Sequence, residues 1–214
     1  MSDLAQQLDD GLKKLGLGLD AQACGRLLDY LALLQKWNKV YNLSAIRDPQ
    51  EMLVKHIFDS LAVVPYIQAE HLIDVGTGGG LPGIPLAIVY PKMQVDLLDS
   101  NEKKTRFLVQ VKAQLGLDNV QVLHCRVEEH QPQPGYDVVI SRAFTALDNF
   151  VEITRHLLAE NGVWWAMKSQ NLPEEMKALP EWVAVDHILD LQVPGLDAKR
   201  ALVAMHKRGE AVNG

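Results

Sequence analysis

Leu72-Ile-Asp-Val-Gly-Thr-Gly-Gly-Gly-Leu-Pro-Gly83 is the stretch of this sequence that decides its fold. Its apolar start is typical of a buried parallel strand, which ends beyond an acid, Asp74. The glycines that follow, Gly76 and Gly78 among them, predict a turn where backbone closely approaches a ligand, because glycine has no Cβ. A second strand, Val95-Asp-Leu-Leu-Asp99, ends in an acid that can bind both hydroxyls of a ribose. The two segments predict a pocket for a nucleoside-containing cofactor, and Asp99 is alternatively the N-cap of the next helix.

The glycine-rich loop fits two different motifs. Gly78 to Gly83 fits the dinucleotide pattern G-x-G-x-x-G. Asp74 to Gly80 reads D-x-G-x-G-x-G, which resembles the first motif of class I S-adenosylmethionine-dependent methyltransferases. The prolines at 82 and 85 favour the methyltransferase reading, because proline has no backbone N–H to offer a pyrophosphate and delays regular helix. A nicotinamide-dependent oxidoreductase is the alternative enzyme, and a turn without ligand is the alternative without function.

Periodicity predicts a helical region followed by alternating strands and helices. Asp20 is a predicted N-cap for a leucine-rich helix, and Asp48-Pro-Gln-Glu51 predicts the start of another. Strands are predicted at 71–75, 94–99, 120–125, 136–141, 162–167, 183–191 and 201–207, and helices at 84–90, 101–115 (ending at Gly116) and 146–159.

This order predicts an α/β fold with a Rossmann-like parallel sheet. The short connection at 193–197 has no room for a crossover helix, so the last two strands are expected to be antiparallel. Such a sheet is typical of class I methyltransferases. We expect residues 1–65 to form a helical region that packs on the core and contacts RNA, and residues 66–214 to form the methyltransferase core.

Length and composition limit the class of protein. A chain of 214 residues suffices for one domain with an appendage, and its net charge of −6 argues against a nonspecific nucleic-acid coat while allowing a local basic face. The two cysteines, Cys24 and Cys125, indicate neither a metal cluster nor a disulfide framework. Without a signal peptide or a membrane-length apolar run, we expect a cytoplasmic protein that binds neither membrane nor metal. Nothing demands more than a monomer.

The segment Ser141-Arg-Ala-Phe144, after the fourth predicted strand, restricts the chemistry. It has neither the Asp/Asn-Pro-Pro-Tyr type motif of enzymes that alkylate exocyclic amines nor the cysteine nucleophile of pyrimidine C5 methylation. Cys125 belongs to another strand and is interpreted as a small buried hydrophobe. A target that is already nucleophilic, such as guanine N7, needs no general base, so no catalytic side chain is assigned. Arg142 is expected to bind the cofactor or a phosphate, or else to form a structural salt bridge. Phe144 is expected either to stack on a base or, as is more common for a lone aromatic residue, to lie in the core.

Several motifs, in order, resemble one family. They are Trp37-Asn-Lys-Val-Tyr-Asn-Leu43, Arg47-Asp-Pro49, His56-Ile-Phe-Asp-Ser-Leu61, Asp74 to Pro85, and Ile140-Ser-Arg-Ala-Phe144. They resemble the bacterial small-subunit ribosomal RNA methyltransferase G family, also called glucose-inhibited division protein B. The resemblance implies S-adenosylmethionine-dependent methylation of guanine N7 in the decoding-region loop of 16S rRNA. It also implies that loss of the protein gives low-level streptomycin resistance.

The resemblance and the motifs together nominate site residues. The family's cofactor contacts map onto Gly76, Leu81, Val127, Glu128 and Arg142, to which the motifs add Asp74, Gly78 and Asp99. From the residues alone, Val127 and Glu128 are equally well explained as a solvated turn.

Charge placement nominates a basic rim for the RNA, consisting of Lys39, Arg47, Lys55, His56 and Lys168. The expected partner is 16S rRNA or a precursor of the small ribosomal subunit. A small-molecule methyltransferase and a catalytically silent RNA- or ribosome-binding protein are the remaining alternatives.

Overall fold

The computed structural model describes residues 3–169 and 172–209, which fold around one mixed sheet of seven strands. The outer bounds of the two predicted regions, residues 1 and 214, lie outside the described residues. The strands are β1 (His71–Val75), β2 (Gln94–Leu98), β3 (Val120–Leu123), β4 (Tyr136–Arg142), β5 (Leu158–Lys168), β6 (Val183–Asp190) and β7 (Ala201–Lys207). Their order in the sheet is β3-β2-β1-β4-β5-β7-β6. Strands β1 to β5 pair in parallel, whereas β7 pairs antiparallel with both β5 and β6, as predicted.

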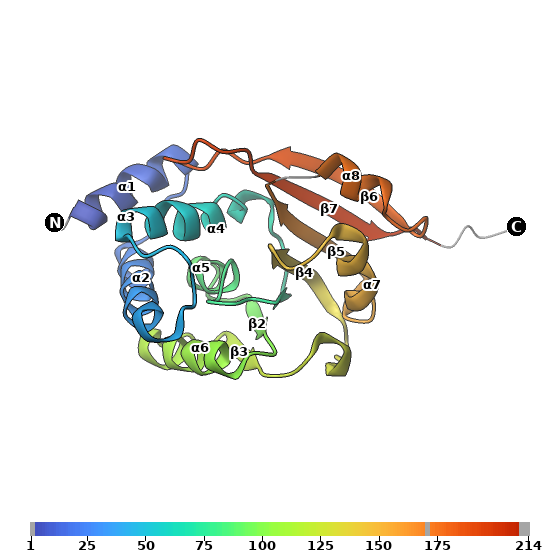
Figure 1. Ribbon diagram of the computed structural model, residues 1–214, viewed down its shortest axis with the longest axis horizontal. Coiled ribbons are helices and arrows are strands. Elements are labelled where there is room, and N and C mark those ends of the chain that lie inside the picture. Colours follow the sequence, from blue (N-terminus) through green and yellow to red (C-terminus); the bar gives the residue numbers. More distant parts are fainter. Residues whose placement is uncertain (1–2, 170–171, 210–214) are drawn as a thin grey trace, which may run out of the picture.

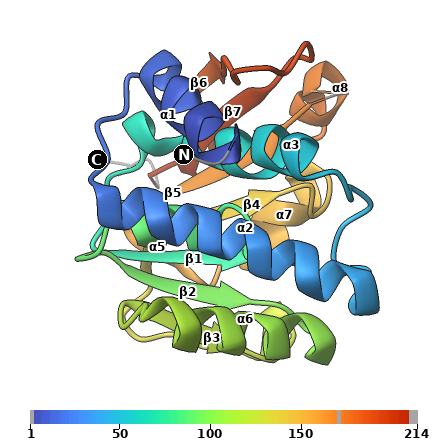
Figure 2. The same cartoon turned by 90° about the vertical axis from the view of Figure 1, so that its left-hand side faces the viewer.

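Helices cover both faces of the sheet (Figure 1). One side carries α1 (Asp3–Leu15), α2 (Ala21–Tyr41), α5 (Gly83–Val89) and α6 (Glu102–Leu115), and in Figure 2 α2 runs in front of α5 and beside α6. A continuous helical segment follows α2 and consists of α3 (Pro49–Met52), the π-helix η1 (Leu53–Phe58) and α4 (Asp59–Leu61). The short 3₁₀ segment η2 (Val64–Tyr66) leads to β1, and the other side of the sheet carries η3 (Val127–Glu129), α7 (Leu147–Thr154) and α8 (Leu172–Lys177).

The helix ends follow the predicted caps at several positions. The Asp20 carboxylate accepts a hydrogen bond from the Ala23 N–H, and the Asp48 carboxylate accepts one from the Glu51 N–H. Helix α6 ends at Gly116, whose φ of +60° is the left-handed conformation that glycine adopts without strain. These polar side chains and glycines therefore place the helix ends where the sequence predicts them.

The boundary between α7 and β5 differs from the prediction. The helix predicted to reach residue 159 ends at Thr154, and β5 begins at Leu158 instead of 162. The reason is a competing backbone pairing, because the Leu157 carbonyl accepts the Tyr136 N–H of β4. Strand β3 is also shorter than predicted and ends at Leu123, so Cys125 lies in a loop. Helix α8 was not predicted.

Two buried clusters form the core, one on each face of the sheet. The larger joins the N-terminal helices to the sheet, since Leu8, Leu34 and Leu61 share it with Leu97 and Leu108. The smaller packs α7 against the other face and contains Phe150 and Trp164. The helices before residue 66 therefore pack on the core, while the division into two domains at residue 65 stays a prediction. None of the described helices has the length and apolar character needed to cross a membrane.

Candidate functional site

A cavity of about 360 Å³ lies where β1, β2 and β4 end and the loops after them begin. Four predicted cofactor residues line it, namely Gly76, Asp99, Val127 and Glu128. The rest of its lining is Leu98, Ser100, Lys104, Cys125, Arg126, Ala143, Phe144 and Ile153. We call this space the cofactor cavity. Its position at the carboxyl ends of parallel strands is where open α/β sheets bind their ligands.

The glycine-rich loop after β1 is held in a conformation that uses its glycines. Gly76, Gly78 and Gly80 have φ values of +66°, +62° and +93°, which side chains rarely tolerate. The N–H groups of Gly76 and Thr77 both donate to the Leu98 carbonyl at the end of β2. This pairing fixes the loop against the neighbouring strand.

Asp74 holds this loop through hydrogen bonds and does not line the cofactor cavity. The Asp74 side chain is buried, and its Oδ2 accepts hydrogen bonds from the Thr77 hydroxyl at 2.7 Å and the Gly83 N–H at 2.8 Å. Its Oδ1 is buried without a hydrogen-bond partner among the described residues. Burial raises the pKa of Asp74 to about 7, although Thr77 and Gly83 oppose the shift. Asp74 is therefore a positioning residue in this geometry.

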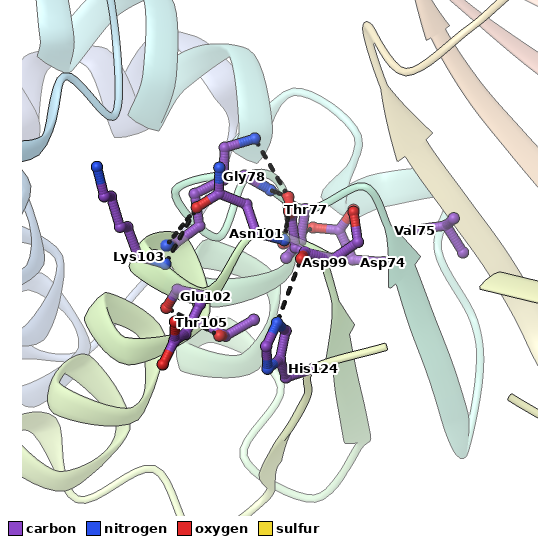
Figure 3. A network of polar contacts seen from close by, with 12 residues as sticks. Asp74, Val75, Thr77, Gly78, Asp99, Asn101, Glu102, Lys103, Thr105 and His124 are labelled. Atoms are coloured by element: carbon purple, nitrogen blue, oxygen red, sulfur yellow. Dashed lines mark hydrogen bonds and ion pairs between the residues drawn. The ribbon is translucent and has the colours of Figure 1, made fainter. Parts of the chain in front are cut away.

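Asp99 lines the cofactor cavity and is buried. Figure 3 shows the polar contacts around its carboxylate. Its Oδ2 accepts the Gly78 N–H at 3.0 Å and approaches the Lys104 ammonium at 3.3 Å, and its Oδ1 accepts the Asn101 N–H at 2.9 Å. The side chain that caps α6 is Asn101, which accepts the Lys103 and Lys104 N–H groups. The helix-cap alternative for Asp99 is therefore wrong, and the carboxylate instead ties the glycine loop to the end of β2.

The far side of the cofactor cavity is apolar. Leu98 and Val127 are buried, and both line the cavity together with Ile153. Glu128, in the same 3₁₀ segment as Val127, is exposed at the cavity. Cys125 also lines the cavity and is half-buried instead of fully buried as predicted; burial raises the pKa of its thiol. The cofactor cavity thus combines an apolar wall with the carboxylates of Asp99 and Glu128.

Phe144 lies over the glycine loop and not in the core, so the core reading of this residue is wrong, and its stacking on a base stays a prediction. The residue is 37% exposed and lines the cofactor cavity. A Cβ on Gly76 would lie 2.3 Å from the Phe144 ring, so a side chain at 76 and this ring position exclude one another. The preceding residue, Ala143, has a left-handed φ of +52°, which turns the chain sharply at the end of β4.

The other predicted cofactor residues do not line the cofactor cavity. Leu81 is buried in the larger core cluster, and Gly78 acts through its N–H to Asp99. Arg142 lines a neighbouring cavity of about 260 Å³, where it donates to the Lys55 carbonyl at 3.0 Å and to Asp59 at 2.9 Å. The salt-bridge alternative for Arg142 is therefore confirmed in geometry.

The predicted basic rim falls into two groups. Lys55, His56 and Lys168 line the same cavity as Arg142, which also adjoins Ala143. Lys39 and Arg47 line a separate hollow of about 140 Å³ near the end of α2.

His56 is a buried, neutral member of the first group. Its Nε2 lies 2.8 Å from the Ser44 hydroxyl, and burial, aided by the charge of Arg142, lowers its pKa to about 4. It therefore contributes no positive charge near neutral pH.

Three functional candidates are absent from the predictions made from the sequence, namely Lys104, Asp59 and Arg200. Lys104 and Arg200 are single charged residues outside the motifs. Asp59 lies in the motif His56-Ile-Phe-Asp-Ser-Leu61, but only the fold brings Arg200 next to it. Phe144 stood in a motif, but a lone aromatic residue does not reveal whether it faces a core or a cavity. The described residues contain no cluster of histidine, cysteine and acidic side chains that could hold a metal.

Comparison with solved structures identifies the class of fold. A SAM-dependent methyltransferase from Aquifex aeolicus superposes with a TM-score of 0.57 at 19% identity, over 79% of this chain and 96% of that one. The putative methyltransferase yhhF from Escherichia coli gives a TM-score of 0.54 at 14% identity, over 72% and 87% of the two chains. Together with the sheet order, these likenesses show the class I methyltransferase fold.

Sequence comparison identifies the family. The profile of the rRNA small subunit methyltransferase G family matches residues 23–203. Ribosomal RNA small subunit methyltransferase G of Hydrogenovibrio crunogenus is 59% identical over 94% of this chain and 93% of its own length. The protein of that name in Pseudomonas syringae is 49% identical over 95% of each chain. The chain belongs to the rRNA small subunit methyltransferase G family.

Proposed function

We propose that this protein transfers the methyl group of S-adenosylmethionine to N7 of a guanosine in the decoding-region loop of 16S rRNA. Membership of an rRNA methyltransferase family supports the reaction and the class of substrate. The choice of N7 rests on the resemblance of the motifs and on the chemistry of the site. The small subunit, or its precursor, is the expected partner.

The residues of the cofactor cavity fit a nucleoside with a sulfonium-bearing chain. The carboxylate of Asp99 lines the cavity and would accept the ribose hydroxyls, and the apolar wall with Val127 suits a purine ring. Gly76 has no Cβ, the Phe144 ring packs over it, and its N–H is already used by the Leu98 carbonyl, so a bound cofactor would meet Gly76 by shape and not through this N–H. When bound, S-adenosylmethionine supplies an electrophilic methyl group.

The single observation that carries the proposal is the contact between two cavities at Ala143. One is the cofactor cavity, and the other is lined by Lys55, Arg142 and Lys168, which suits a polyanion. A base that reaches this junction from the basic side meets the cofactor cavity beside Phe144. Guanine N7 has an in-plane lone pair and no proton to lose, so alignment for in-line displacement is the enzyme's task. Neither a general base nor a covalent intermediate is needed.

The test is methyl transfer from tritiated S-adenosylmethionine to 16S rRNA, or to small subunits from a strain that lacks this gene. Nuclease digestion and chromatography then identify the labelled nucleoside. Label in 7-methylguanosine, lost in the Gly76→Ala variant, is the expected result. Cofactor binding without incorporation would favour a small-molecule methyltransferase or a silent RNA-binding protein. Absence of cofactor binding would reopen the nicotinamide alternative.

A second test addresses the predicted basic rim. Charge reversal at Lys39 and Arg47, which line one hollow, is expected to weaken rRNA methylation by raising the KM for RNA. Unchanged methylation in the double variant would remove this hollow from the RNA interface.

A further inference from the structure

The cavity beside the cofactor cavity is built from segments that are far apart in the sequence. Lys55 and Asp59 come from the helical segment before the sheet, and Arg142 and Lys168 come from the ends of β4 and β5. Arg200 comes from the connection immediately before β7. We call this space the basic cavity. Its volume is about 260 Å³. Ala143 lines both this cavity and the cofactor cavity, so the two are neighbours.

Two guanidinium groups in the basic cavity share one carboxylate. Arg142 Nη1 donates to Asp59 Oδ2 at 2.9 Å, and Arg200 Nε donates to Asp59 Oδ1 at 3.0 Å. The Asp59 side chain is 4% exposed, and those of Arg142 and Arg200 are 19% and 22% exposed. The three side chains therefore carry one net positive charge in a place with little access to water.

The neighbouring charges do not cancel this excess. Lys55 pairs with Glu51 at 2.9 Å and Lys168 with Glu175 at 2.6 Å, so each lysine brings its own counter-charge. Neither of those carboxylates lines the basic cavity. A partly buried positive charge without a partner is unfavourable, and an anion that enters the cavity would be stabilised by charge-assisted hydrogen bonds.

We propose that Arg200, together with Arg142, forms a phosphate-binding site for the substrate RNA and holds a backbone phosphate beside the target nucleotide. This inference rests on the function proposed above. Guanidinium groups match phosphate oxygens with paired donors. A phosphate fixed here sets the position of the chain without reading its sequence, and the shared wall at Ala143 directs the neighbouring base to the cofactor cavity.

The carboxylate of S-adenosylmethionine is the other anion that this chemistry suits. Neither Arg142 nor Arg200 lines the cofactor cavity, which favours the RNA phosphate. The two sources make different predictions, since one couples Arg200 to RNA affinity and the other to cofactor affinity.

The test compares Arg200→Gln with Lys199→Gln in the full-length protein. Lys199 is exposed and adjacent, and its carbonyl, which accepts from Arg200 Nη1, survives the substitution. Binding to unmodified small subunits is measured as a function of salt, together with the KM for subunits, kcat and the Kd for S-adenosylmethionine. For Arg200→Gln we expect a KM raised about tenfold and a log–log salt slope shallower by about 0.7–0.9, with cofactor Kd and kcat nearly unchanged. Lys199→Gln should change the slope clearly less.

A second variant keeps the inference testable if Arg200→Gln does not fold. Ser169 is exposed on the rim of the basic cavity, so Ser169→Glu adds a negative charge there without touching Asp59, and it should also raise the KM for subunits. Equal KM values and slopes for wild type, Arg200→Gln and Ser169→Glu would overturn the phosphate site. A raised cofactor Kd with unchanged RNA binding would assign the anion to the cofactor and overturn it too. Failure of the wild-type protein to methylate rRNA would instead refute the proposed function itself.

Discussion

Replacement of Asp99 by asparagine tests whether this residue binds the cofactor or only supports the glycine loop. The carboxylate accepts the N–H groups of Gly78 and Asn101 and faces the Lys104 ammonium. An asparagine keeps the size but has one acceptor oxygen, so its amide group must face one of those two N–H groups. The variant also loses the negative charge that Lys104 and the ribose hydroxyls would meet.

The expected magnitude follows from these contacts. A hydrogen bond from a hydroxyl to a charged group contributes about 1.5–3 kcal/mol, and asparagine can retain at most one of the two ribose contacts. We therefore expect a loss of about 2–3 kcal/mol in the free energy of binding S-adenosylmethionine, which is roughly a 30- to 150-fold higher Kd. The unsatisfied buried N–H should also lower the free energy of unfolding by about 1–3 kcal/mol.

Titration calorimetry at pH 7 gives the Kd, and urea unfolding gives the stability. Asp137→Asn is the control, because Asp137 Oδ2 alone accepts two backbone N–H groups, from Glu70 and His71, at the opposite ends of the strands. An asparagine there can keep both contacts through its one amide oxygen, so stability and cofactor Kd should both stay close to wild type. If folded Asp99→Asn bound the cofactor as tightly as wild type, Asp99 would be a loop support alone and the ribose assignment would be refuted.

Three further predictions concern the glycine loop and two buried titratable groups. Gly76→Ala places a Cβ on a residue with φ +66° and 2.3 Å from the Phe144 ring. It should lower the free energy of unfolding by about 1–2 kcal/mol and weaken cofactor binding. If adding Phe144→Ala did not restore part of this stability, the clash with the ring would not be the cause. The pKa of His56 is lowered to about 4 in the folded protein, so between pH 6.5 and 4 the unfolded chain binds a proton at this histidine more readily than the folded one. As pH falls through this range, the free energy of unfolding of wild type should decrease by up to about 3 kcal/mol relative to His56→Gln. The pKa of Asp74 is raised to about 7, so wild type should lose stability relative to Asp74→Asn as pH rises from about 4 to 7. Urea unfolding across this pH range measures both, and a stability difference that does not vary with pH would contradict either one.

The sequence predicted the parallel sheet, the antiparallel end and the cofactor edge because those features are local. A strand that ends at glycines and an acid is visible in a dozen residues, and the caps at Asp20, Asp48 and Gly116 need only their neighbours. The end of α7 was not predictable in this way, because it depends on the Leu157 carbonyl pairing with Tyr136, which lies in another strand.

The place of charged side chains was the least predictable part of the site. Arg142 is the last residue of β4, a common position for ligand-binding residues, yet its side chain bonds to Asp59 and to the Lys55 carbonyl in the N-terminal helical segment. That orientation depends on how residues more than eighty positions apart pack together, and Arg200 depends on a partner still farther away. A sequence pattern can name the strand end but cannot choose between two cavities that share one residue, Ala143.

The two acids of the cofactor motifs illustrate the same limit and explain how a glycine-rich loop can be a binding site. Glycines lower the cost of close approach but raise the entropy that must be lost when the loop is fixed. The Asp74 carboxylate accepts hydrogen bonds from Thr77 and Gly83, and the Asp99 carboxylate accepts one from Gly78. The loop is thus ordered by the fold, and the cofactor does not have to order it on binding. Asp74 is fully buried, its pKa is raised, and one of its oxygens has no hydrogen-bond partner in the described part of the chain, whereas the Asp99 carboxylate lines the cavity. Two acids that look equivalent in sequence therefore divide the work, since one shapes the loop and the other both shapes it and faces the ligand.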